Sequence, residues 1–96
     1  MIALVAVLTV KDGSQSSFET AAAALAAAVR ANEPGCKLYT FSKSRTDPCS
    51  YTALELYETQ DDVAAHGTTE HMKALGPALG ACFAARPVIT MYDVVV

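Results

Sequence analysis

Residues 55–75 read ELYETQDDVAAHGTTEHMKAL and contain three structural signals in succession. The first is the end of a strand over residues 51–58, whose alternation puts Tyr51, Ala53, Glu55 and Tyr57 on one face. The second is Thr59 three residues before Asp62, a spacing typical of a capping box that opens a helix over residues 60–65. The third is Gly67, after which Thr68 or Thr69 begins another short helix through about residue 75.

Before this stretch, the sequence predicts a strand, a long helix and a second strand. Residues 2–10 are apolar on both alternating faces, which is typical of a strand covered on both sides. Residues 15–32 are nearly polyalanine, with one stripe of large residues, and favour a helix packed closely on a sheet. Glu33-Pro34-Gly35 ends that helix. Residues 36–43 then alternate, with Cys36, Leu38 and Thr40 on one face and Lys37, Tyr39 and Phe41 on the other.

After it, Gly76-Pro77 predicts an interruption of the helix, residues 78–85 form a short helical or irregular piece, and residues 88–95 form the last strand. The order strand, helix, strand, strand, helix, strand predicts an α+β fold, a ferredoxin-like βαββαβ antiparallel sheet in one domain over residues 1–96. The helices can cover only one face of such a sheet, while the first strand and Val94-Val95-Val96 imply that the other face is also dry. We therefore expect a homodimer formed through the open face.

Composition restricts the classes of partner. Hydrophobic residues make up 52% of the chain and charged residues 18%, with a net charge of -3. The seven Lys and Arg residues are scattered, which argues against nucleic acid. The apolar opening of ten residues is too short to cross a membrane and lacks a cationic leading region, so we expect a cytoplasmic protein. Three widely spaced cysteines predict neither a disulfide framework nor a metal site.

Several motifs resemble one known family. They are Glu33-Pro34-Gly35-Cys36, Tyr39, Glu55-Leu56-Tyr57 and Ala65-His66-Gly67-Thr68-Thr69-Glu70-His71-Met72-Lys73. Together with the element order, these motifs make the whole chain similar to an antibiotic biosynthesis monooxygenase domain. Within that family, the motifs most resemble those of bacterial quinol monooxygenases and of the isomerase that degrades phosphorylated autoinducer-2. The resemblance implies a dimeric α+β barrel. It also implies chemistry on a small molecule without metal, flavin or haem, so we expect no cofactor.

The haem-degrading and polyketide-tailoring branches of the same family fit less well. The haem-degrading enzymes use an asparagine, a tryptophan and a histidine, and the matching positions here are Ala6, His66 and Gly76. The polyketide-tailoring enzymes also rely on a tryptophan and an asparagine. The chain contains no tryptophan, which argues against both branches.

Six residues are candidates for the site. His66 and Glu55 are the predicted catalytic residues, because imidazole titrates near neutral pH and a carboxylate on an apolar strand needs a partner such as His66, Arg86 or the backbone. Tyr57, Tyr51, His71 and Arg86 are the predicted substrate-binding residues. Each also has a structural interpretation. His66 would be a helix-end histidine, Glu55 an anchor to the backbone, and Tyr57 and Tyr51 packed strand aromatics. His71 would be a dimer contact, and Arg86 would form a surface salt bridge.

Three functions remain open on this evidence. The first is oxidation of a small electron-rich aromatic or quinol, in which the substrate supplies the electrons for oxygen. The second is isomerisation of a small phosphorylated hydroxy-ketone, which needs a cationic phosphate pocket that only Arg86 and Lys73 could provide. The third is a non-catalytic dimeric domain that binds a small molecule, since a fold does not fix a function.

Overall fold

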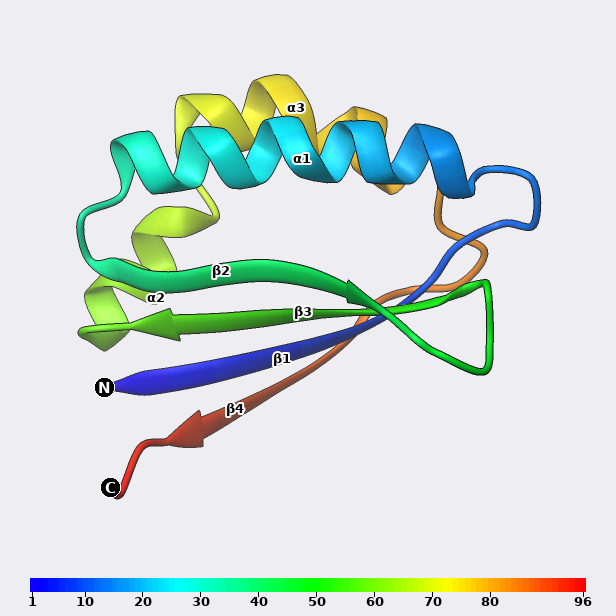
Figure 1. Cartoon of the computed structure of the whole chain (residues 1–96). Helices are drawn as coiled ribbons and strands as arrows, with labels where there is room; N and C mark the ends of the chain where they lie inside the picture. The colour runs from blue at the N-terminus through cyan, green and yellow to red at the C-terminus, as the bar shows by residue number, and fades with distance from the viewer.

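Four strands and three helices make up the fold in a computed structural model that describes residues 1–96 (Figure 1). Their order is β1 (Ile2–Thr9), α1 (Gln15–Asn32), β2 (Cys36–Lys43), β3 (Ser50–Tyr57), α2 (Gln60–His66), α3 (Glu70–Gly80) and β4 (Val88–Asp93). All neighbouring strands are antiparallel, in the order β2-β3-β1-β4. This is the predicted ferredoxin-like α+β fold.

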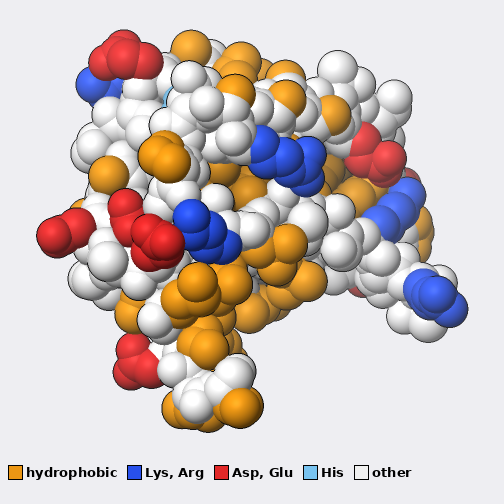
Figure 2. All heavy atoms as spheres, turned by 60° about the vertical axis from the view of Figure 1, so that its left-hand side comes forward, with side chains coloured by type: hydrophobic (Ala, Val, Ile, Leu, Met, Phe, Trp, Pro, Cys, Tyr) orange, Lys and Arg blue, Asp and Glu red, His pale blue; other side chains and the backbone are white.

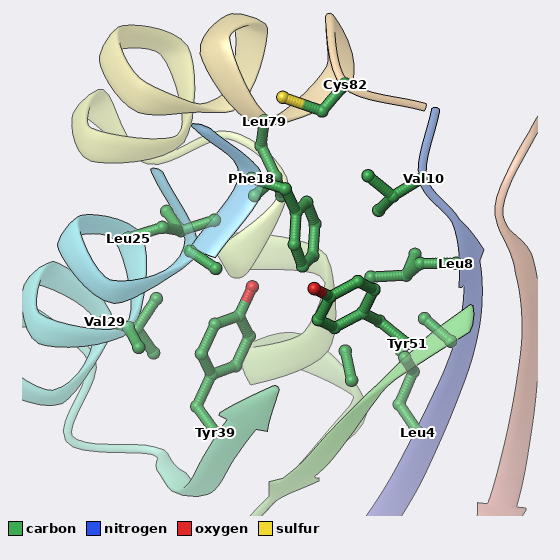
Figure 3. Close-up of a cluster of buried hydrophobic side chains, with 14 of the residues drawn as sticks. Leu4, Leu8, Val10, Phe18, Leu25, Val29, Tyr39, Tyr51, Leu79 and Cys82 are labelled. Atoms are coloured by element: carbon green, nitrogen blue, oxygen red, sulfur yellow. The ribbon is translucent and has the colours of Figure 1, made fainter. Parts of the chain in front are cut away.

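The helices lie on one side of the sheet, and the hydrophobic core fills the space between them. Figure 1 shows α1 and α3 beside one another above the strands, with α2 close to the end of β3. Phe18, Leu25 and Val29 of α1 are fully buried in one core cluster that also contains Leu4 and Leu8 of β1, and the predicted stripe is confirmed (Figure 3). The alternating face of β3 is also confirmed, because its four predicted members are all buried: Tyr51, Ala53, Glu55 and Tyr57.

Helix starts follow the sequence signals, but the end of α3 does not. Thr59 and Asp62 form the predicted capping box, and the Thr69 side chain caps α3. The predicted interruption at Gly76-Pro77 is wrong, because α3 continues through Pro77 to Gly80. Proline removes one backbone hydrogen bond from a helix, but packing of α3 against α1 compensates for that loss here.

A β-bulge at the start of β2 corrects a second expectation. Cys36 pairs with Tyr57 and Leu38 pairs with Leu56, so two residues of β2 span one step of β3. Simple alternation predicted that Cys36 and Leu38 share a face. Because of the bulge they do not, and Cys36 packs against the core beneath the helices.

The other face of the sheet has no helix and is apolar. Val7 is 44% exposed and Leu54 39% exposed, and every residue of β4 is exposed. Figure 2 shows hydrophobic side chains gathered over the lower part of the molecule, toward the C-terminal end. No helix is both long enough and apolar enough to span a bilayer. This uncovered face is the one through which dimerisation is predicted.

Candidate functional site

Both histidines converge on one carboxylate, that of Glu33. The Nδ1 atom of His66 lies 2.9 and 3.0 Å from the two Glu33 oxygens, and the Nε2 atom of His71 lies 2.5 Å from Oε2. The side chains of Glu33, His66 and His71 are only 10%, 14% and 13% exposed. The pairing therefore joins the turn after α1 to the end of α2 and the first turn of α3.

This arrangement fixes which ring nitrogens carry protons. A carboxylate only accepts hydrogen bonds, so His66 must donate from Nδ1 and His71 must donate from Nε2. In a neutral His66 ring, Nε2 is then the atom that can accept a proton. Glu33 thus sets the tautomer and the orientation of the histidine that the sequence favours as the base.

The turn that carries Glu33 is held against α2. The backbone N–H of Glu58 donates to the Gly35 carbonyl at 2.9 Å, and the Asp62 side chain lies directly over Gly35. A Cβ at position 35 would meet the Asp62 carboxylate, which would have to give up its hydrogen bonds with Thr59 to make room. The close approach of the turn to α2 brings Glu33 within reach of His66.

Glu55 and Tyr57 form a second buried pair on β3. The Tyr57 hydroxyl donates to Glu55 Oε1 at 2.5 Å. Burial raises the pKa of Glu55, although the Tyr57 hydrogen bond and the charge of His66 act in the opposite direction. Burial and then the neighbouring Glu55 carboxylate raise the pKa of Tyr57, so this hydroxyl stays protonated and donates. The sequence predicted His66, Arg86 or the backbone as the Glu55 partner, but the hydrogen bond comes from Tyr57.

Aromatic rings connect the two pairs to the core. The ring centroid of His66 lies 5.2 Å from that of Tyr39 and 5.7 Å from that of Tyr57. Tyr39 in turn meets Phe41 edge-on at 5.4 Å. Burial, and then the Glu55 and Glu33 carboxylates, raise the pKa of Tyr39. We call Glu33, Tyr39, Glu55, Tyr57, His66 and His71 the polar cluster.

Two predicted site residues lie away from the polar cluster. Tyr51 pairs with Leu8 at the opposite end of β3 from Tyr57, which pairs with Ile2. Tyr51 lies four positions before Glu55 on the strand, a separation of about 13 Å. The Tyr51 hydroxyl donates to Glu19 Oε2 at 2.5 Å, and burial together with this carboxylate raises its pKa to about 12. Arg86 is exposed and precedes Val88, which pairs with Val7 near the same far end.

Glu33 was not among the predicted site residues, although it lies in the predicted helix-ending turn and in one of the motifs that resemble the family. The structural reason for its position is the pairing of β2 with β3, which places Cys36 opposite Tyr57. The turn after α1 must therefore lie beside the start of α2. No group of three or more His, Cys, Asp or Glu side chains is arranged to hold a metal ion.

Comparison with known proteins gives one family. The family model described as antibiotic biosynthesis monooxygenase matches residues 1–77. The structure of a proposed antibiotic biosynthesis monooxygenase from Caulobacter crescentus is 42% identical over 99% of this chain and 90% of that one, with a TM-score of 0.94. A protein from Nitrosomonas europaea, proposed to have the same activity, is 24% identical over 100% of both chains, with a TM-score of 0.91, and shows the shared fold alone. No curated protein matched the chain.

Proposed function

The chain belongs to the antibiotic biosynthesis monooxygenase family, and from this premise we propose that it oxidises a small electron-rich hydroxyaromatic or quinol with molecular oxygen. His66 is the proposed general base, acting through Nε2. Glu55 is the proposed second proton-handling group, and Tyr57 and His71 are the proposed substrate-binding residues. The proposal needs no protein-bound cofactor, because the substrate supplies the electrons.

The observation that carries the proposal is the bond from His66 to Glu33. A general base must be held in one orientation and one tautomer to accept a proton efficiently. Both Glu33 oxygens lie within 3.0 Å of Nδ1, which supports Nε2 as the free, basic atom. The partly buried carboxylate also stabilises the imidazolium that forms when Nε2 takes a proton.

The chemistry balances with one molecule of oxygen. His66 removes the hydroxyl proton, and the resulting aryloxide passes an electron to oxygen. The radical pair then joins to form a C–O bond at an unsubstituted ring carbon ortho or para to the hydroxyl, which in a 1,4-quinol is the ortho carbon. That carbon loses its hydrogen as the peroxide O–O bond breaks, which leaves a quinone carbonyl and releases hydroxide. Hydroxide takes up the proton held by His66 and leaves as water. A dihydroxyarene plus oxygen thus gives a hydroxyquinone plus water.

Glu55 and Tyr57 are suited to the steps in which the substrate loses a proton and becomes an anion. The raised pKa of Glu55 brings this carboxyl closer to the pH at which it can exchange a proton. The Tyr57 hydroxyl stays protonated and can shift its hydrogen bond from Glu55 toward a developing substrate anion. The two residues share the face of β3 that lies beneath His66.

The isomerase alternative is less well supported by the same geometry. A phosphorylated substrate needs cationic groups that bind phosphate oxygens. No Lys or Arg side chain pairs with Glu33 or Glu55, and Lys73 pairs with the exposed Glu70. Arg86 lies toward the far end of the sheet.

The test is oxygen uptake by purified protein with dihydroxyarenes, comparing two matched variants. In His66→Asn, the amide N–H replaces Nδ1 as donor to Glu33, but no basic ring nitrogen remains. In His71→Gln, the amide replaces the Nε2 donor to the same carboxylate. We expect His66→Asn to lower kcat/KM by about a hundredfold or more, and His71→Gln by less than about tenfold.

Three outcomes would contradict the proposal. Full oxygen uptake in His66→Asn would show that His66 is not the base. Formation of hydrogen peroxide in a 1:1 ratio to oxygen consumed would indicate simple two-electron oxidation, without transfer of an oxygen atom to the ring. Turnover of a hydroxy-ketone phosphate without oxygen would instead identify the isomerase.

We also propose that the working form is a homodimer, joined through the face of the sheet opposite the helices. Val7 and Leu54 lie on this face and would lose their contact with water in the dimer. Burial of apolar surface contributes about 25 cal/mol per Å². The same interface would cover the exposed β4 side chains on that face.

A further inference from the structure

Three tyrosines of the sheet are buried beneath the helices, and one of them has a free hydroxyl. Tyr51 donates to Glu19 at 2.5 Å, and Tyr57 donates to Glu55 at 2.5 Å. The Tyr39 hydroxyl makes no hydrogen bond, although the residue is only 5% exposed. Buried polar groups in folded proteins almost always have a hydrogen-bond partner. The free hydroxyl of Tyr39 is therefore a feature that packing alone does not explain.

The oxygen of this hydroxyl borders an opening in the protein. No side-chain oxygen or nitrogen that is closed off from solvent lacks a hydrogen-bond partner. Since the Tyr39 hydroxyl has no partner, its oxygen must be accessible, even though the rest of the residue is enclosed. Figure 3 shows this hydroxyl pointing from β2 toward the helices. A small molecule that enters the space beneath the helices can bind to it.

Both proposed proton-handling groups lie beside Tyr39. The ring centroid of His66 is 5.2 Å from that of Tyr39, and Glu55 pairs with Tyr39 across β2 and β3. Glu33 binds Nδ1 of His66 and leaves Nε2 free. The two rings are close enough for one aromatic ligand to contact the Tyr39 hydroxyl and Nε2 of His66 together.

The Tyr39 hydroxyl is suited to donate to an anion. Burial, and then the Glu55 and Glu33 carboxylates, raise the pKa of Tyr39, so the hydroxyl keeps its proton. Tyr57 can donate to a substrate only by releasing Glu55, whereas Tyr39 has to release only water. A donor that is already in place and unpaired stabilises developing charge without a cost of reorganisation.

We propose that Tyr39 is a further catalytic residue, whose hydroxyl donates a hydrogen bond to the substrate oxygen that His66 deprotonates. It stabilises the aryloxide and holds the reacting oxygen next to Nε2 of His66. A phenolic oxygen fits this pair, because it donates to the imidazole before the proton moves and accepts from Tyr39 afterwards. The assignment rests on the function proposed above, since it names the anion-stabilising group of that reaction.

The direct test is the ionisation of bound 4-nitrophenol under nitrogen, because the phenol and the phenolate absorb at different wavelengths. We expect a higher fraction of phenolate on the protein than in water at the same pH. Tyr39→Phe removes only the hydroxyl and should lower the ionisation constant of the bound phenol by about tenfold. Tyr92→Phe is the matched control, since Tyr92 is exposed on β4, and it should leave this constant unchanged.

Two further measurements separate a catalytic role from a structural one. Tyr39→Phe should lower kcat/KM for oxygen uptake by about tenfold or more, because the aryloxide loses its donor. The same substitution should not lower Tm, because the hydroxyl has no partner within the protein. Tyr51→Phe should lower Tm, because it removes the donor to Glu19.

Three results would overturn the proposal. The first is equal ionisation of the bound phenol in Tyr39→Phe and the wild type. The second is a fall in Tm for Tyr39→Phe as large as that for Tyr51→Phe. The third is a phenol that is no more ionised on the wild type than in water. Absence of oxygen uptake with every dihydroxyarene, while the ionisation of the phenol still depends on Tyr39, would contradict only the proposed function.

Discussion

Removing the Glu33 carboxylate is the sharpest test of the polar cluster. In Glu33→Ala, His66 and His71 both lose the acceptor that now lies 2.5–3.0 Å from their ring nitrogens. Each hydrogen bond to a charged group contributes about 1.5–3 kcal/mol to stability. Water can reach side chains that are 13% and 14% exposed, so we take the lower end of the sum. The expected loss in free energy of unfolding is about 3 kcal/mol.

The assay is urea and thermal unfolding followed by circular dichroism, at one fixed protomer concentration because dimerisation would alter stability. A loss of about 3 kcal/mol corresponds to a fall in Tm of about 12–24 °C for a domain of this size. The free energy of unfolding of Glu33→Gln should lie between those of the wild type and Glu33→Ala. Its amide keeps one oxygen that accepts from His66, but its NH₂ group faces His71 as a donor in place of an acceptor. Glu58→Ala is the matched control, since Glu58 is 51% exposed and pairs only with Lys37 at the surface. Its loss should be less than about 1 kcal/mol.

A free energy of unfolding for Glu33→Ala within about 0.5 kcal/mol of the wild type would refute the cluster as a source of stability. A double-mutant cycle separates the pairwise contribution from cavity effects. Glu33→Ala combined with His66→Ala should show a coupling of about 1–2 kcal/mol, because the two side chains share direct hydrogen bonds.

Glu55, the turn at Gly35, the open face of the sheet and the absence of a metal requirement can each be tested separately. The raised pKa of Glu55 means that its stabilising contribution is complete below the ordinary value of 4.5 and is lost as pH rises through the folded value. The stability of the wild type relative to Glu55→Gln should therefore fall with rising pH, by up to about 1.4 kcal/mol per unit in urea titrations, and a flat difference would contradict this. Gly35→Ala should lose about 1–3 kcal/mol through the clash with Asp62, whereas Gly80→Ala, which meets nothing within 4 Å, should not destabilise. Val7→Asp on the open face should convert a dimer into a monomer in light scattering, and the exposed helix variant Thr20→Asp should not. Dialysis against EDTA should leave oxygen uptake unchanged; loss restored by a divalent ion would show that Glu33 and the histidines hold a metal.

Local signals predicted most of the fold because they depend on neighbours in sequence. The alternation of β3, the capping box at Thr59 and the apolar stripe of α1 each involve residues within a few positions of one another. Two exceptions lie within single elements. At Pro77, packing between α3 and α1 outweighs a local preference, and in β2 a bulge breaks the predicted alternation between Cys36 and Leu38. Sequence patterns describe local preferences, and they fail where a contact between elements has the larger free energy.

The site was predicted less completely because its partners are distant in sequence. Glu33 meets residues 33 and 38 positions away, and nothing local distinguishes it from any acid at the end of a helix. Tyr51 and Glu55 share a face of β3, which made them one group by pattern, but they lie at different ends of the sheet. A strand pattern reports the face on which a side chain lies and does not report which helix covers it.

The β-bulge in β2 explains why the polar cluster forms at this end of the sheet. Without an extra residue, Cys36 and Tyr39 would lie on opposite faces, because they are three positions apart. The bulge lets Cys36 pair with Tyr57 while Tyr39 pairs with Glu55, so all four side chains lie beneath the helices. It also places the turn that carries Glu33 beside Glu58 and the start of α2. One irregularity in pairing thus brings Tyr39 and Glu33 to His66 together, and removing it should displace both.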